Sequence, residues 1–192
     1  MAAIGSQRLP EEELQDYARL QVRSGLLDEA ELLADVVAAT RAEMPGIDAE
    51  VLARAWLAGA RSALRREAAG WPTATDHDRL RAAFAECTEH GVPVLEGVAD
   101  RAAATADRVR RTTTGEEVRG IVWFTPYDVW QAIDHGTLPV VLWHGSGAVA
   151  APTDSLHTAV TGCLARHGLS SDDDAGRIVV NARWRRRPSP GH

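Results

Sequence analysis

Two cysteine–histidine pairs are the residues of this chain whose types and spacing could bind a metal ion. Cys163 and His167 lie four residues apart in one predicted helix, and Cys87 and His90 lie three residues apart in another. Either spacing puts both side chains on one side of a helix, so the two helices together could offer zinc two sulfur and two nitrogen ligands. Both cysteines also fall on apolar helix stripes, where reduced core thiols are common. We therefore expect buried free thiols, with no metal site and no cofactor.

The stretch from Leu138 to Gly147 suggests a second kind of chemistry. It predicts a buried strand that ends in the turn His144-Gly145-Ser146-Gly147. The strand and its His-Gly pair are similar to the oxyanion loop of α/β-hydrolases, which carry a Gly-x-Ser-x-Gly nucleophile turn later in the chain. No such turn follows Gly147. The alternative is a tight turn whose glycines supply the backbone angles, and we assign no catalytic residue.

Aromatic and polar residues gather near the ends of the predicted strands. The candidates for lining one binding groove are Tyr127, Asp128, Trp130, Trp143 and His144. The alternative is that the tryptophans fill the core and the exposed residues share no role. A second hypothesis is a small hydrolase or transferase that uses Asp128 and His144. It requires their side chains to come within hydrogen-bonding reach, roughly 3 Å, in an open pocket.

A cluster of arginines surrounds one tryptophan near the end of the sequence, in the order Arg183-Trp184-Arg185-Arg186-Arg187. Arg185 and Arg186 are candidates for binding phosphates, with the indole stacking on a base. The alternative is a charged edge strand that resists aggregation, with Trp184 packed on the core. The chain has a formal net charge of −6, which argues against nucleic acid as the partner.

The composition excludes several classes of protein. The chain has 192 residues and no lysine, so it has no lysine for a Schiff base or a phosphate-binding loop. Its 2 cysteines cannot build a disulfide framework. No run of 18 apolar residues is present, and residues 1–10 lack the apolar stretch of a signal peptide. We therefore expect a cytoplasmic protein without a membrane partner.

Residues 9–70 predict a helical region of about three helices. Pro10 followed by three glutamates suits the first turn of a helix, and Gly25 suits its end. Asp28 and Glu31 have the spacing of a capping box for the second helix. A third apolar stripe at helical spacing follows, so this region is predicted to form an N-terminal helical arm.

Residues 71–187 predict an α/β sandwich domain. After a helix capped by Thr75 or Asp76, apolar segments with the strand period alternate with helices. The four predicted strands are Val92–Val98, Ile121–Phe124, Val140–Trp143 and Arg177–Trp184, and residues 171–174 are predicted as a loop. The alternation favours an α+β fold, in which the helical arm precedes a four-stranded sheet covered by helices in a two-layer sandwich. Residues 188–192 are predicted to be a disordered tail.

Several of these segments together resemble an uncharacterised bacterial family, the domains of unknown function numbered 6891. The resemblance extends from about Leu14 to Arg187. It rests on the segments Tyr17–Val22, Trp71-Pro72, Asp78–Leu80, Ala82–Glu86, Arg119-Gly120 and Trp184–Arg187. The chain departs from the family pattern at Glu96–Ala99, which contains none of the cysteines that many members carry there. The resemblance implies the architecture and brings no assigned activity.

The leading functional hypothesis is a non-enzymatic interaction or regulatory domain. No candidate nucleophile has a recognisable base or acid partner in its sequence context. Another protein is the partner class that this hypothesis favours, ahead of nucleic acid or a membrane. The sequence identifies neither a ligand nor an oligomeric state.

Overall fold

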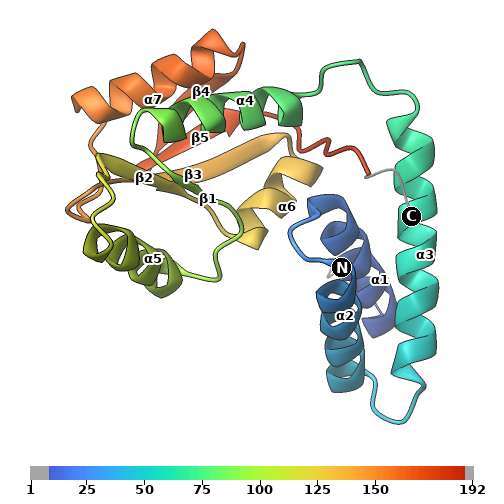
Figure 1. Cartoon of the computed structure of the whole chain (residues 1–192). Coiled ribbons are helices and arrows are strands. Elements are labelled where there is room, and N and C mark those ends of the chain that lie inside the picture. Colours follow the sequence, from blue (N-terminus) through green and yellow to red (C-terminus); the bar gives the residue numbers. More distant parts are fainter. Residues whose placement is uncertain (1–8, 189–192) are drawn as a thin grey trace, which may run out of the picture. The chain divides into compact units, whose positions relative to one another are not determined.

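The computed structural model of the chain describes residues 9–188 (Figure 1). The described residues divide into two compact units, 9–71 with 187–188, and Pro72–Arg186. Of the predicted tail at 188–192, all but Pro188 lies outside the described residues. Among the described helices, none combines the length and the apolarity needed to span a membrane.

The described part of the first unit contains α1 (Pro10–Ser24), α2 (Glu29–Glu43) and α3 (Ala49–Ala68). α1 ends at Gly25, which adopts the left-handed conformation that glycine reaches without strain. At the start of α2, Asp28 and Glu31 bond each other's backbone N–H groups in the predicted capping box. Small and aliphatic side chains, among them Ala18 and Val36, form the core between the helices.

Helices and strands alternate in the second unit. Its helices are α4 (Asp76–Glu89), α5 (Arg101–Thr113), α6 (Pro126–Asp134) and α7 (Ser155–Arg166). Its strands are β1 (Val94–Leu95), β2 (Gly120–Trp123), β3 (Thr137–His144), β4 (Ser170–Asp174) and β5 (Arg177–Asn181). They form one mixed sheet in the order β1-β2-β3-β5-β4, in which β1 and β2 are parallel and the other neighbours are antiparallel. The predicted α+β class is confirmed.

The sheet has five strands, one more than predicted. Residues Ser170–Asp174 form β4 at the edge of the sheet, where a loop was expected for 171–174, and they pair with β5. None of the side chains of β4 is buried, so the segment lacks the alternating apolar pattern that marks a strand in sequence. Backbone pairing holds this strand in place, and its aspartates protect an exposed edge.

Helices cover both faces of the sheet, where a two-layer sandwich was expected (Figure 1). α4 and α7 lie on one face, and the rings of Phe84 on α4 and Phe124 after β2 are 5.9 Å apart. α5 packs on the other face, where Ala104 contacts the cluster around Ile121 and Trp123. All four residues of β2 are buried, as expected for a strand covered on both sides. The continuous apolar run of β2, rather than an alternating one, reflects this double cover.

α7 approaches the sheet closely at Gly120. A Cβ at this position would come within 2.7 Å of the Leu156 side chain and 2.8 Å of the Trp143 carbonyl oxygen. Glycine therefore allows α7 to pack close to β2, whereas the Cβ of any other residue would push the helix away from the strand. This contact, together with the packing of α4 against α7, positions the helix ends that carry the candidate site.

Candidate functional site

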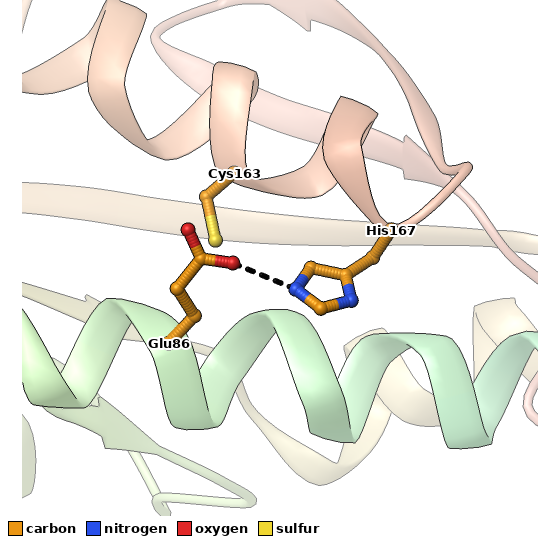
Figure 2. A group of neighbouring side chains, drawn as sticks. All are labelled: Glu86, Cys163 and His167. Carbon is orange, nitrogen blue, oxygen red and sulfur yellow. Dashed lines mark hydrogen bonds and ion pairs between the residues drawn. The ribbon is translucent and has the colours of Figure 1, made fainter.

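The contact between α4 and α7 brings three potential metal ligands together. Figure 2 shows Cys163 and His167, from the end of α7, facing Glu86 of α4. The sulfur, the ring nitrogen and the carboxylate oxygen of these residues all lie within 4.8 Å of one another. The spacing of four residues between Cys163 and His167 carries both side chains to the same side of the helix end. Glu86, which was not a candidate in the sequence analysis, therefore joins the predicted Cys163–His167 pair.

The carboxylate of Glu86 links the side chains of this group. Its Oε2 accepts a hydrogen bond from His167 Nε2 at 2.7 Å, and its Oε1 accepts one from Arg166 Nε at 3.1 Å. Hydrogen bonds from Arg166 and then His167 lower the pKa of Glu86 to about 2, so the carboxylate is ionised at neutral pH. The Cys163 thiol donates to the Ala83 carbonyl oxygen at 3.3 Å.

The two cysteines are both buried and free, and they lie near each other where α4 packs on α7. Burial, followed by the proximity of Cys163, raises the pKa of Cys87 to about 12. Burial also raises the pKa of Cys163. Neither sulfur is therefore a thiolate at neutral pH, and neither has the lowered pKa of a reactive cysteine.

A cavity of about 150 Å³ lies beside the thiols, between α4 and α7. Its walls are apolar, and its lining residues are Cys87, His90, Val92, Arg119, Leu156, Ala159, Val160, Cys163 and Arg166. The exposed side chains of His90 and Arg119 stand at the rim. Within residues 9–188, neither of these two side chains has a hydrogen bond or ion pair. The cavity thus combines an apolar interior with two unpartnered nitrogen-bearing groups at its edge.

The candidate residues at the start of α6 have partners within the fold. Asp128 is buried, and one of its oxygens accepts hydrogen bonds from the backbone N–H and the hydroxyl of Thr125, in the capping box of α6. Its other oxygen accepts a hydrogen bond from Arg177 at 2.7 Å. Tyr127 is 63% exposed and lies edge-on to Trp130, with 6.4 Å between ring centroids. Asp128 therefore starts a helix, and only its neighbour Tyr127 offers an open surface.

Of the two candidate residues at the end of β3, Trp143 lies in the core and His144 is half-buried. Trp143 is buried, with its ring 5.1 Å from that of Trp123 and the guanidinium of Arg101 above it at 5.5 Å. The imidazole of His144 bonds the carboxylate of Asp154 through Nε2 at 2.9 Å. The five residues predicted to line one groove are thus spread over the core, the start of α6 and the end of β3.

Asp128 and His144 lie on opposite faces of the sheet. His144 lies four residues after Val140 on β3, so the two side chains share a face. Val140 pairs with Ile178, and Arg177, which binds Asp128, precedes Ile178 on β5. Since neighbouring residues of a strand point to opposite faces, Arg177 points away from the face of His144. The structure therefore does not bring together the pair that the hydrolase or transferase hypothesis requires.

Arg185 and Arg186 lie in the segment that follows β5, where they meet the start of α4. The carbonyl oxygen of Arg185 accepts a hydrogen bond from the Thr75 hydroxyl at 3.1 Å. Burial first, and the charge of Arg186 second, lower the pKa of His77 to about 4. Trp184 is only 2% exposed, so its indole packs in the core and is not available for stacking on a base.

Sequence reasoning missed Glu86, Arg119 and Arg166. Each is a charged residue on a predicted helix or loop, and such residues are usually solvated. Their role depends on the packing of α4 against α7 and on the contact between the start of β2 and Gly91. At this contact, the Arg119 N–H donates a hydrogen bond to the Gly91 carbonyl oxygen at 2.9 Å. These contacts join segments far apart in the chain, so no local pattern could reveal them.

The comparisons with curated proteins and with solved structures give no match. A family model described as a domain of unknown function, DUF6891, matches residues 7–188. The match includes every residue of the α4–α7 site. The chain therefore belongs to the DUF6891 family, as the resemblance of its segments predicted.

Proposed function

We propose that this protein is a cytoplasmic, non-enzymatic regulatory or interaction domain that binds a small monocarboxylate between α4 and α7. The observation that carries the proposal is the apolar cavity with Arg119 and His90 unpartnered at its rim. Apolar pockets with a few convergent polar groups are the usual form of small-ligand sites. A monocarboxylate would place its carboxylate against the polar groups at the rim and its hydrocarbon body against the apolar walls of the cavity.

The size of the cavity limits the body of the ligand. At about 150 Å³, it matches the volume of an apolar protein cavity that accepts a ring the size of benzene. Hexanoate and benzoate are of this size, whereas acetate leaves most of the space empty and decanoate exceeds it. Transfer of each methylene group from water into the cavity contributes roughly 0.8 kcal/mol, so affinity rises with chain length until the cavity is full.

The rim supplies the charge that selects an anion. The Arg119 side chain lies along Gly91, and a Cβ on that glycine would sit 3.3 Å from Arg119 Cγ. The backbone of Arg119 is also bonded to Gly91, next to His90, so the two rim groups are held near each other. A guanidinium binds a carboxylate through two parallel hydrogen bonds. Because the whole chain has a net charge of −6, the attraction of an anion to this site depends on the local positive charge of Arg119.

Two further observations support a binding role and the proposed compartment. The thiols of Cys87 and Cys163 are protonated at neutral pH, which suits walls of a pocket better than nucleophiles. Two neighbouring free thiols that line one cavity stay reduced in a reducing compartment, as the cytoplasm is. A bound ligand that orders the α4–α7 contact would change the surface offered to a partner protein.

Isothermal titration calorimetry of the full chain with acetate, butyrate, hexanoate, benzoate and decanoate tests the proposal. We expect affinity to rise to a maximum at hexanoate or benzoate and then fall. Hexylamine, which has the same body and the opposite charge, should not bind. Arg119→Gln should weaken hexanoate binding about tenfold, since it removes a charge-assisted hydrogen bond.

Arg66→Gln provides the matched control, because Arg66 is an exposed arginine of α3 in the first unit. It should bind hexanoate as the unchanged protein does. Affinity that ignores chain length, equal binding of hexylamine, or an Arg119→Gln variant with unchanged affinity would each refute the proposed ligand class.

A further inference from the structure

The geometry of the α4–α7 contact points to a binding site for a divalent transition metal ion, zinc first, on Glu86, Cys163 and His167 (Figure 2). These residues offer one sulfur, one nitrogen and one oxygen, a donor set that zinc takes at about 2.0–2.3 Å. The assignment does not rest on the proposed carboxylate ligand, because only Cys163 of the three donors lines the cavity and none of them is a rim residue.

The three donors are close to the separation that a zinc ion imposes. Ligand atoms of a tetrahedral zinc site are roughly 3.5 Å apart, as the bond lengths require. Here no pair of donors is more than 4.8 Å apart, and Glu86 Oε2 is already 2.7 Å from His167 Nε2. Closing the group around an ion therefore needs side-chain shifts of about 1 Å, without a change in the helices.

The donors approach from two sides. Cys163 is 3% exposed and presents its sulfur from the core, whereas the side chains of Glu86 and His167 are about one quarter exposed, at 25% and 28%. An ion between them would be shielded on one side and reachable from solvent on the other. Sulfur and imidazole ligands favour zinc, cobalt and related ions over magnesium and calcium.

Proton transfer accompanies binding. The Cys163 thiol gives its proton to solvent, and the resulting thiolate forms the sulfur–metal bond. The hydrogen bond between Glu86 and His167 opens, Nε2 gives its proton to solvent while Nδ1 carries one, and His167 binds through Nε2 as a neutral imidazole. With three ligands from the protein, a water molecule is the fourth ligand that completes four-coordination.

Arg166 opposes the ion electrostatically. It shares the Glu86 carboxylate, but its side chain is 59% exposed and can turn toward solvent. Replacing Arg166 with glutamine removes a positive charge beside the ion and one competitor for the carboxylate. We therefore expect Arg166→Gln to bind metal severalfold more tightly than the unchanged protein. A purely structural ion pair would give the variant no such gain.

Titration of the chelator-treated full chain with Co²⁺ is the test. We expect one ion per chain, a sulfur-to-cobalt charge-transfer band, and displacement of the band by Zn²⁺ but not by Mg²⁺. The zinc dissociation constant should be about 1 µM or lower. Absence of stoichiometric binding, or binding without the charge-transfer band, would overturn the assignment.

Three variants locate the ion. Cys163→Ser should abolish the band, and Glu86→Gln and His167→Asn should each weaken binding by at least about tenfold. His135→Asn is the matched control, because His135 is an exposed histidine that caps the end of α6. Glu86 and His167 are partly exposed, so their variants keep the proposal testable even if Cys163→Ser fails to fold. Unchanged cobalt affinity in Glu86→Gln and His167→Asn would contradict the site.

Discussion

The two ends of α4 place polar side chains in opposite situations. At its start, the Thr75 hydroxyl bonds both Asp78 and the Arg185 carbonyl, and His77 packs edge-on against Trp184 at 4.7 Å. At its end, Glu86 meets the soft donors of α7, and an apolar cavity opens beside Cys87.

The difference lies in what covers each end. The segment after β5 closes over the start of α4, where the Arg183 N–H also bonds Asp76. The end of α4 packs against α7 and the start of β2, and among the described residues no acidic side chain pairs with Arg119 there. Polar groups at the closed end stabilise the fold, while those at the open end are available to a ligand. The predictions below test this contrast, from the largest expected effect to the smallest.

The closed end should lose stability in acid through His77. Burial, aided by the charge of Arg186, lowers the pKa of His77 to about 4, so the folded chain disfavours the protonated form. The stabilising contribution is complete above the unfolded pKa of about 6.5, is lost as the pH falls toward 4, and amounts to at most about 3 kcal/mol. Urea unfolding of the chain and of His77→Gln at both ends of this pH range measures it. Equal acid losses in the two proteins would show that His77 is not responsible.

Removal of the α4 cap should have the next largest effect. Thr75→Ala removes the oxygen that accepts from the Asp78 N–H and the hydroxyl that bonds Arg185. Loss of such a cap costs about 1–2 kcal/mol of unfolding free energy. Thr105→Ala is the control, because the exposed Thr105 bonds only within its own helix. Equal denaturation midpoints for the two variants would argue against a closed start of α4.

Filling the cavity should affect binding more than folding. Ala159 lines the cavity, and Ala159→Leu should lower hexanoate affinity by at least about tenfold by occupying its space. Ala165→Leu changes an exposed residue of the same helix outside the cavity and should leave calorimetric affinity unchanged. If both variants bind equally, the ligand lies elsewhere.

The smallest effect on stability is expected from Glu86→Gln. Its ion pairs with Arg166 and His167 are partly solvated, and such pairs contribute little to folding. The thermal midpoint of this variant in metal-free buffer should shift less than that of Thr75→Ala. A larger shift than Thr75→Ala would mean that the Glu86 cluster serves the fold in the same way as the closed end.

The sequence carried the information for elements with a clear local pattern. The Asp28–Glu31 capping box and the apolar run from Ile121 to Phe124 are local signals, and the structure forms a helix start and a strand there. β4 has no buried side chain and therefore no pattern to detect. The position of β4 depends on backbone pairing with β5, and backbone pairing leaves no periodic pattern of apolar residues in the sequence of β4.

Only part of the candidate site could be predicted from the sequence. The spacing of Cys163 and His167 identified one pair of donors, since both residues lie on one helix end. Glu86 and Arg119 joined them through tertiary packing between distant segments. Asp128 drew attention as a polar residue near a strand end, yet its carboxylate is used by the start of α6 and by Arg177.

A nuclear magnetic resonance titration of the ¹⁵N-labelled chain with hexanoate tests the contrast between the two ends of α4 most directly. Saturable amide shifts at Cys87–Val92, at Arg119 and along Ala159–Arg166, with none at Thr75–Asp78, are the predicted result. No saturable shift, or equal shifts at both ends of α4, would contradict the assignment of the α4–α7 contact as a ligand site.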